Sequence, residues 1–538
     1  MTLPIPLVVR LKTQVKDIDV TARIGSLTFR STIPGGFASA SVSFNAPINV
    51  QPDEIAYFGR MYIYDGRNGM TVWEGRVEDP GRTASASGSV WNLNAIGPSA
   101  HASDRTFPII YVDTSTDRWE RSQYSTKGAQ TEVSEIDSNT PCLQVRAEEG
   151  IPVPITWDGD WIYRYLQFTG QTLARVRCDH VEGGASSNYQ TGLYVRTGST
   201  LVGFVSTDNW FTTPHTLSGT FGFTNWTTGL DNCSIAAYRN VSATTADALA
   251  WSNFYNICVR SVVKDASGND LTTPYTVNDI DPAQVVTDLL GRYLNQYDGP
   301  NAVIQSSGNR IPQLAYPDGI SSAGIFEDLA TLDPAYYWAA WETTPAGKWR
   351  FFYGPWPTHV RYDADISDGF DSPGSATDLY NEVQVRWLDP AGKMRATIRT
   401  STVPVLNAAG MVRTAFIDIS DELGTEANAQ RVGDNFLLEH QYPPNAGTLT
   451  VARAILDLDQ GRMVQPWEIN PGNLIRVRGV LPRVDSLNPN ARDGVTVFKV
   501  VSVDYDSGTA SATLELDSYS RTVAQQLANL KNDRIRRR

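Results

Sequence analysis

The residue types that most often carry out chemistry are few in this chain and are widely separated. Its five histidines are His101, His180, His215, His359 and His440, and they fall in different predicted elements. The sequence contains no HExxH zinc motif, no GxSxG nucleophile motif and no glycine-rich phosphate loop. The Asp363-Ala364-Asp365 and Asp457-Leu458-Asp459 runs do not match a calcium-binding loop. We therefore expect no catalytic residue, no cofactor and no metal site.

Carboxylates between residues 113 and 260 offer one catalytic alternative. A glycosidase needs two acidic side chains, and Asp158, Asp160, Asp179 and Glu182 lie among aromatic residues in this stretch. Acidic residues in a Thr- and Gly-rich β region far more often form turns or solvate loops. We therefore interpret these four residues as turn-forming or loop-solvating residues and not as a catalytic pair.

Tryptophans in the same stretch are better candidates for binding. Indole rings stack on the apolar faces of sugars, while neighbouring Asn and Asp side chains satisfy the hydroxyl groups. The candidate glycan-binding residues are Trp157, Trp161, Trp210 and Trp226, with Asp208 and Asn209. The alternative is that the tryptophans fill a β-sandwich core, and we favour this for most of them. Trp210 and Trp226 are flanked by polar residues typical of loops, so we expect them to be the exposed pair.

The overall charge excludes some classes of partner. The 538 residues include 45 basic and 58 acidic side chains, which gives a net charge of −13. A body that wraps nucleic acid or docks on an anionic membrane needs positive surface. Basic residues gather only in the extreme tail, and we interpret this tail as a solvated helix end: Lys531, Arg534, Arg536, Arg537 and Arg538. We expect no specific nucleic-acid binding.

The cysteines and the apolar segments indicate the cellular compartment in which the protein is made. Cys142, Cys178, Cys233 and Cys258 lie in one interval without a CxxC pair, so zinc binding is not expected. Up to two disulfides remain possible, although buried free thiols better suit a protein made in the cytoplasm. The apolar start, Pro4–Val9, is too short and too proline-rich for a secretion signal. No stretch approaches the roughly 20 apolar residues of a membrane span.

Two distant stretches have the same pattern of strands and turns. Residues 57–95 and 471–516 each predict a strand that ends at a glycine turn, a second strand, a polar hairpin and a third strand. The predicted strands are Met61–Tyr64, Val72–Val77 and Ser89–Ala95 in the first copy, and Leu474–Arg478, Val497–Val503 and Ala510–Leu516 in the second. Two unrelated antiparallel sheets could also resemble each other this much. If the copies are a true duplication, a trimer would arrange six similar modules in a ring.

The rest of the chain predicts further strands and four helices. Residues 113–260 have short, evenly spaced strands with polar loops, typical of a jelly-roll sandwich. Asp281-Pro282 predicts a helix start, and helices are also expected over 325–332, over 425–441 and from Thr522 onward. Between the second and third lies an aromatic hairpin, Tyr336–Tyr353, which we interpret as domain core plus a subunit contact.

These elements predict a multidomain, mainly β protein with α+β parts. We expect two similar β-barrel domains, an inserted jelly-roll β-sandwich and a small α+β domain. The expected boundaries are residues 1–112 for the first barrel, 113–260 for the insert, 261–375 for the α+β domain, 376–520 for the second barrel with its helix, and 521–538 for a terminal helix and basic tail.

Four segments carry a resemblance to a known family: 378–387, the helix over 425–441, 470–475 and 498–505. With these, the chain resembles the tail-hub proteins of long-tailed bacteriophages, often described as minor tail or tail-associated proteins. That family is related in fold to the trimeric baseplate hub of contractile-tailed phages. The resemblance covers residues 7–108 and 262–520. The insert resembles carbohydrate-binding modules through Thr216–Phe221 and Ala248–Phe254.

The resemblance implies a structural role in a virion. It implies a homotrimeric hub at the tail tip, which adapts a sixfold tube to a threefold tip and leaves a channel for DNA. The implied partners are two further copies of the chain, the distal tail ring protein, the tape-measure protein and other tail-tip or fibre proteins. The alternatives are an adsorption protein that binds host cell-wall glycan through the insert, and, less favoured, an enzyme that degrades the host envelope.

Overall fold

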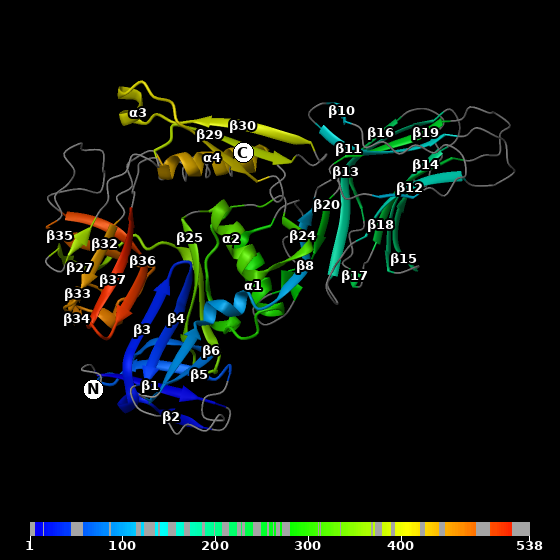
Figure 1. Cartoon of the computed structure of the whole chain (residues 1–538). Coiled ribbons are helices and arrows are strands. Elements are labelled where there is room, and N and C mark those ends of the chain that lie inside the picture. The colour runs from blue at the N-terminus through cyan, green and yellow to red at the C-terminus, as the bar shows by residue number, and fades with distance from the viewer. Residues whose placement is uncertain are drawn as a thin grey trace.

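We describe the chain from a computed structural model. It describes the residues in the ranges 6–13, 16–44, 57–85, 88–113, 280–309, 311, 314–333, 335–366, 369–371, 379–388, 393–419, 426–440, 447–479 and 495–518, and between 120 and 271 the backbone of the strands. The fold is mainly β, and the described helices are short (Figure 1).

The N-terminal part forms a β module that we call the opening module. Its strands are β1 (Leu7–Lys12), β2 (Asp17–Asp19), β3 (Ile24–Thr32), β4 (Gly35–Phe44), β5 (Arg60–Asp65), β6 (Thr71–Ser85) and β7 (Gly88–Ile96). Neighbouring strands pair in the order β1–β5–β6–β7–β4–β3, all antiparallel. Every second residue faces inward, as Leu7, Val9 and Leu11 illustrate, because side chains alternate between the faces of a strand.

The C-terminal part forms a second β module, the closing module. Its strands are β27 (Val360–Asp365), β28 (Phe370–Asp371), β32 (Gly447–Val451), β33 (Ile455–Asp457), β34 (Arg462–Val464), β35 (Leu474–Arg478), β36 (Val495–Asp506) and β37 (Ser511–Ser518), with the 3-10 turn η5 (Pro466–Glu468). The pairing order is β27–β35–β36–β37–β32–β28.

The predicted repeat is confirmed at the level of strand pairing. β5–β6–β7 and β35–β36–β37 are antiparallel meanders, and each continues on the same side into a fourth and a fifth strand. The modules differ at the other side, where β1 runs antiparallel to β5 but β27 runs parallel to β35. Two β modules with similar strand pairing are therefore present, and their division into separate barrel domains stays a prediction.

An α+β unit lies beside the opening module (Figure 1). It contains β8 (Thr106–Asp113), α1 (Pro282–Arg292), β23 (Val303–Ile304), β24 (Leu314–Ser321), α2 (Ser322–Leu332), β25 (Tyr336–Thr343) and β26 (Trp349–Pro355), with the 3-10 turns η2 (Pro98–Ala102) and η3 (Gly299–Asn301). The predicted start of α1 is confirmed, because the Asp281 side chain accepts a hydrogen bond from the Ala283 N–H in a capping box.

A small layer of three strands and two helices lies above this unit in Figure 1. It comprises β29 (Glu382–Leu388), β30 (Met394–Thr400), α3 (Pro404–Ala408), β31 (Thr414–Asp418) and α4 (Glu426–His440). The strand order is β30–β29–β31. α4 confirms the predicted third helix and packs on this sheet, whereas α3 was not predicted.

The inserted segment forms two β-sheets. The first contains β10 (Glu135–Asp137), β11 (Thr140–Glu148), β13 (Leu173–Ala185), β16 (His215–Gly222), β17 (Thr227–Thr228), β19 (Leu249–Tyr255) and β20 (Cys258–Ser261). The second contains β9 (Glu120–Ser122), β12 (Asp158–Tyr165), β14 (Tyr189–Thr197), β15 (Thr200–Ser206) and β18 (Asn232–Arg239). A separate pair, β21 (Val263–Lys264) with β22 (Asp270–Leu271), follows.

The insert is joined to the body by strand pairing as well as by covalent connections. β20 pairs with β8, which in turn pairs with β24 of the α+β unit. The first sheet of the insert therefore continues into the body. The predicted helix from Thr522 lies outside the described residues, and no helix within them is both long and apolar enough to cross a membrane.

Candidate assembly surfaces

The two β modules are joined edge to edge by β3 and β36. The register runs from Thr28 opposite Asp506 to Thr32 opposite Ser502. The ladder extends by one bond at each end, where Ile33 N–H donates to the Val501 carbonyl at 2.8 Å and Ser507 N–H donates to the Leu27 carbonyl at 2.9 Å. Residues of both modules form one continuous hydrophobic core, so the pair behaves structurally as one body.

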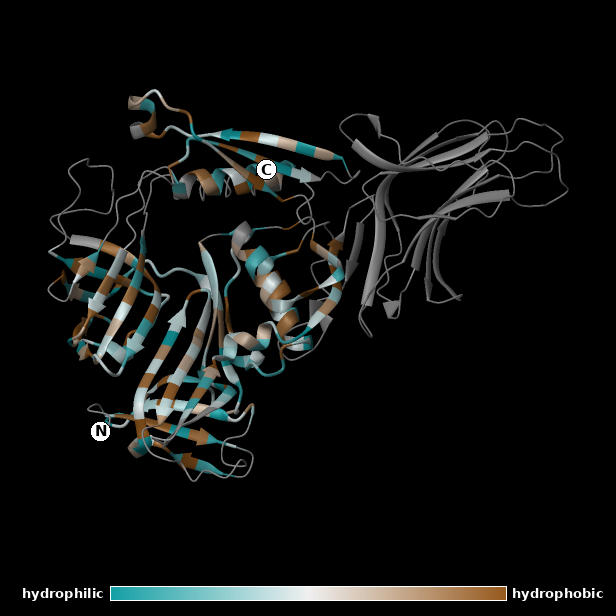
Figure 2. Cartoon of the chain, in the orientation of Figure 1, coloured by the Kyte–Doolittle hydropathy of each residue, from teal (hydrophilic) through white to brown (hydrophobic). Residues whose placement is uncertain are grey.

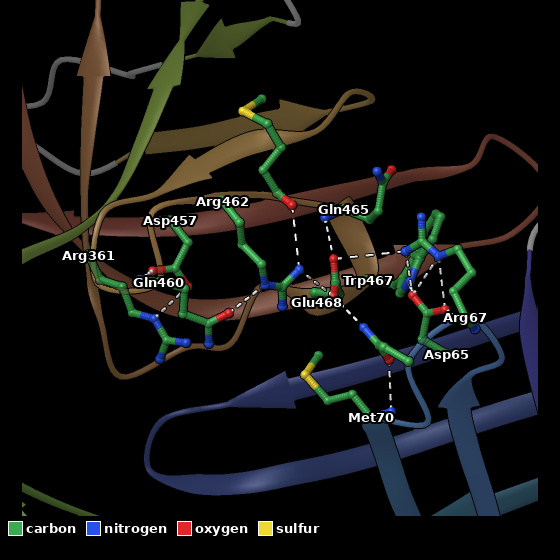
Figure 3. Close-up of polar contacts among 12 residues, drawn as sticks. Asp65, Arg67, Met70, Arg361, Asp457, Gln460, Arg462, Gln465, Trp467 and Glu468 are labelled. Carbon is green, nitrogen blue, oxygen red and sulfur yellow. Dashed lines mark hydrogen bonds and ion pairs between the residues drawn. The ribbon is translucent and has the colours of Figure 1, made fainter.

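A second contact between the modules is built on the buried carboxylate of Asp65. It lies at the end of β5 and accepts hydrogen bonds from Trp467 Nε1 of η5 at 3.0 Å and from the Arg67 backbone N–H at 2.8 Å, and it also pairs with the Arg67 guanidinium (Figure 3). Burial opposes ionisation of Asp65, but the hydrogen bonds from Arg67 and Trp467 outweigh it and lower its pKa to about 2. The Asp65 carboxylate is therefore charged at neutral pH although it has no exposed surface.

Glu468 forms the centre of the same network. Its buried carboxylate accepts hydrogen bonds from Arg462 Nη1 at 2.9 Å and from the Gln465 backbone N–H at 2.7 Å, both within the closing module. Asn68 Nδ2 of the opening module donates to it at 3.3 Å, and Figure 3 shows the contacts converging from both sides. A buried carboxylate is stable only when its oxygens are satisfied, so this arrangement fixes the relative orientation of the two modules.

The aromatic hairpin β25–β26 contacts both modules. Tyr337 Oη donates to the Gly472 carbonyl of the closing module at 3.2 Å, and the Thr343 N–H donates to Glu74 Oε2 of the opening module at 2.8 Å. β25 also pairs with β4, and Gly36 is required there because a Cβ would lie 2.1 Å from the Ala340 carbonyl oxygen. The hairpin holds the α+β unit against both modules.

The predicted core role of this hairpin is confirmed. The inward rings of Trp338, Phe351 and Tyr353 are buried in the core of the α+β unit. Phe326 of α2 packs on two of them, with ring centroids 5.0 Å from Trp338 and 5.5 Å from Phe351. A contact with another subunit stays a prediction.

The sheet β30–β29–β31 has one covered face and one open face. Val383 and Val385 of β29 pack with Leu437 of α4 on the covered face. The opposite, open face presents Met394, Ile398 and Phe416, which are 47%, 57% and 61% exposed. Figure 2 shows apolar residues alternating with polar ones along these strands. Large exposed apolar residues gathered on one face mark a candidate contact surface.

The candidate glycan-binding residues are not brought together by the described structure. Trp157, Trp210, Trp226, Asp208 and Asn209 lie outside the described residues. Trp161 lies in β12, of which the backbone alone is described. The glycan platform therefore stays a prediction.

Three histidines fall in the described side-chain structure, and they are far apart in the chain. His101 contacts Asp104, His359 contacts Asp459, and His440 Nδ1 contacts the Phe436 carbonyl. Among the residues whose placement is described, no group of three or more His, Cys, Asp or Glu side chains could hold a metal ion.

Sequence reasoning missed the Asp65–Trp467 contact and the open face. The first joins residues 402 positions apart, and no local pattern indicates such a pair. The second had a signal, because Met394, Ala396 and Ile398 alternate along a strand whose neighbour β29 already has its own apolar face.

Comparison with known proteins gives structural neighbours and no sequence family. No family model matches the chain, and no curated protein matches it. The structural neighbours are phage tail proteins. The chain is similar to the tail protein from Neisseria meningitidis MC58, with 10% identity, a TM-score of 0.44, and coverage of 95% of this chain and 96% of that one. It is also similar to the prophage MuSo2 43 kDa tail protein from Shewanella oneidensis, with 10% identity, a TM-score of 0.43, and coverage of 95% and 98%.

A partial similarity involves a carbohydrate-binding module. Caldicellulosiruptor saccharolyticus CBM27-1, solved in complex with mannohexaose, aligns over 28% of this chain and 96% of its own length, with 9% identity and a TM-score of 0.19.

Proposed function

We propose that this chain is a structural virion protein, a homotrimeric hub at the distal end of a phage tail. In this role three chains place six similar β modules around one axis and adapt a sixfold tail tube to a threefold tip. The observation that carries the proposal is the duplicated strand pairing, because two equivalent modules on one chain are what a trimer needs to imitate a ring of six.

The joint between the modules supports the proposal. A ring element that continues a tube must hold its modules at a fixed angle, and the β3–β36 ladder and the buried Asp65 and Glu468 carboxylates do this within each chain. The chain acts as an adaptor and has no catalytic role. It is incorporated in the virion at the tail tip, after synthesis in the host cytoplasm.

The partners follow from this position. The ring binds the distal tail ring protein on one side and receives the end of the tape-measure protein, and other tail-tip or fibre proteins bind the outside. The open face of Met394, Ile398 and Phe416 is an apolar surface for one of these proteins. The chain has a net charge of −13, and in this role acidic residues also predominate on the channel wall. Negative charge there prevents passing DNA from adhering. A lumen lined mainly by Lys and Arg would contradict this.

The mass of the purified chain in solution tests the proposal. Light scattering after size-exclusion chromatography should give three times the chain mass of 59.2 kDa at high protein concentration. Electron-microscopy class averages of the same sample should show a ring with six similar densities. A single-chain mass across the whole concentration range would argue against the hub.

Adsorption to host cell-wall glycan through the insert is a second candidate function. It is favoured by the two β-sheets that the insert adds to the body, an arrangement not required for a ring. A glycan array with the full chain should show binding that is lost in the double variant Trp210→Ala/Trp226→Ala and kept in Trp356→Ala, a change outside the insert. No binding to any cell-wall sugar would make the insert a spacer.

A further inference from the structure

The modules match residue by residue around the middle of β6 and β36. Val77 N–H donates to the Gly59 carbonyl at 2.7 Å, and Val500 N–H donates to the Asn473 carbonyl at 2.9 Å. In return, Phe58 N–H donates to the Val77 carbonyl at 2.8 Å, and Gly472 N–H donates to the Val500 carbonyl at 2.9 Å. Phe58 and Gly472 both have positive φ, of 63° and 82°. Val77 of the opening module therefore corresponds to Val500 of the closing module.

Both strands then shift register at the same place. The β6–β7 pairing skips one residue between Val77 and Asp79, and the β36–β37 pairing skips one between Val500 and Ser502. Before the shift, one edge of β36 pairs with β35. Beyond the shift, the same edge pairs with β3 over Ser502–Asp506. The corresponding stretch of β6, Asp79–Thr83, pairs with β7 on one side, and in the described part of the chain no strand pairs with its other edge.

The closing module has a matching free strand. In the opening module the strands pair in the order β7–β4–β3, and in the closing module they pair in the order β37–β32–β28. β28 therefore occupies the position of β3. By register, Phe370 and Asp371 of β28 occupy the positions of Leu27 and Thr28. β28 pairs with β32, and the described residues include no strand on its outer edge.

We propose that the free edge of β6 binds β28 of a second copy of the chain at the Thr83 end of this edge, where the register places Asp371 opposite Thr83. This repeats between chains the β3–β36 joint that each chain makes internally. Such a head-to-tail contact closes into a ring when the rotation per chain fits, and three copies close it here. The inference rests on the proposed hub and specifies which strands form its subunit joint.

Two exposed aromatic side chains lie at the end of this edge. Tyr57 and Phe58 are each 67% exposed, and Phe58 is held by its backbone against Val77, where the free edge begins. At the corresponding point of the internal joint, the Ile33 N–H reaches the Val501 carbonyl. Any strand paired along the whole of this edge would therefore end beside Tyr57 and Phe58 and cover them.

Pro80 makes the joint between chains weaker than the internal one. The bonds at Val501 and Ser507 show that the odd-numbered residues of β36 point their backbone groups toward β3. Val503 corresponds to Pro80, which has no N–H, so a strand paired with β6 loses one hydrogen-bond donor there. A proline on a free edge also suppresses unspecific pairing with other chains.

Disulfide trapping tests the proposed pairing. The double variant Asp371→Cys/Thr83→Cys places cysteines at the positions that correspond to Thr28 and Asp506. These two are opposite each other and do not share hydrogen bonds, with Cα atoms about 4.5 Å apart, which suits a disulfide. After oxidation, denaturing electrophoresis should show a covalent trimer. The matched control Thr28→Cys/Asp506→Cys should form its disulfide within one chain.

The possible outcomes distinguish a failure of the proposed β6–β28 pairing from a failure of the proposed trimeric hub. The single variants Asp371→Cys and Thr83→Cys control for the four native cysteines and should give no trimer. A trimer by light scattering without cross-links overturns the β6–β28 pairing and leaves the hub standing. Cross-linked ladders without a closed trimer support the pairing and overturn the ring. A monomer without cross-links overturns both.

Two further variants test the edge without a disulfide. Pro80→Val restores the donor that Val503 supplies in the internal joint, so dissociation of the trimer should become several-fold slower. Phe58→Ser should weaken the trimer several-fold, whereas Phe416→Ser, at 61% exposure on the open face, should leave it unchanged. Equal effects of the two serine variants, or no effect of Pro80→Val, would contradict pairing along the whole edge from Asp79 to Thr83.

Discussion

The opening and closing modules share their hydrogen-bond register but fill their cores with different side chains. In β6, Gly75 leaves room for the indole of Trp73, since a Cβ on Gly75 would lie 2.3 Å from the Trp73 ring. In β36 the position that corresponds to Gly75 is the buried Phe498. Ring volume has moved by two residues along the same face of the strand. The comparison shows that the same backbone pairing is compatible with different core side chains, so the two modules need not share sequence identity.

Removing the largest ring of the opening module should give the largest effect. Trp73 is fully buried, so Trp73→Ala should destabilise the chain by about 3–5 kcal/mol. Because the core is continuous across both modules, hydrogen exchange should also accelerate in β36 and β37 of the closing module. Unchanged exchange in those strands, measured by mass spectrometry, would show that the modules unfold independently.

Neutralising the buried carboxylate at the joint should have the next largest effect. Asp65→Asn removes charge-assisted hydrogen bonds to Arg67 and Trp467 and should cost about 2–3 kcal/mol in denaturant unfolding. Asp17→Asn, which breaks an exposed pair with Arg10, should cost less than about 1 kcal/mol. Similar losses in both variants would mean that the joint contributes no special stability.

Acid should weaken the same joint over a defined range. The pKa of Asp65 is about 2 in the folded chain and 3.8 in its ordinary state. Its stabilisation, about 2 kcal/mol, is therefore complete above about pH 5 and is lost as the pH falls through 3.8 toward 2. The difference in unfolding free energy between wild type and Asp65→Asn should shrink over this range, and a constant difference would contradict the assignment.

Filling the space above Gly75 should have a smaller effect. In Gly75→Ala the new methyl group meets the Ile96 carbonyl oxygen at 2.2 Å as well as the Trp73 ring, so we expect a loss of about 1–3 kcal/mol. The control is Gly81→Ala on the same strand, where the nearest atom is 3.6 Å away and stability should change by less than about 1 kcal/mol. Thermal unfolding measures both, and equal melting temperatures would contradict the size exchange.

The smallest expected effect is at Phe58. Phe58→Gly copies the glycine that the closing module has at this point, which relieves a positive φ but adds freedom to the unfolded chain. The two terms are each about 0.5–1 kcal/mol and oppose each other, so the melting temperature of the single chain should hardly move. A large loss would show that Phe58 stabilises the folded chain itself and is not reserved for an assembly contact.

Local patterns in the sequence predicted most elements but not how they meet. Alternation and capping residues placed β5 to β7, β35 to β37, α1 and α4, because these signals lie within a few residues of each other. The β3–β36 ladder, the contact between Asp65 and Trp467 and the free edge of β6 depend on chain segments hundreds of residues apart. Such contacts are chosen by the fold as a whole, and a single sequence carries no periodic trace of them.

The pairing of β20 with β8 has a mechanical consequence. It consists of two residue pairs, Val259 with Asp113 and Arg260 with Val112. It connects the sheet of the insert to β8, which pairs with β24 of the α+β unit. A pulling force on the insert would load these few bonds together with the covalent connections of the insert. This short ladder is separate from the β3–β36 joint, so its rupture would detach the sheet of the insert from β8 and leave the joint between the modules intact.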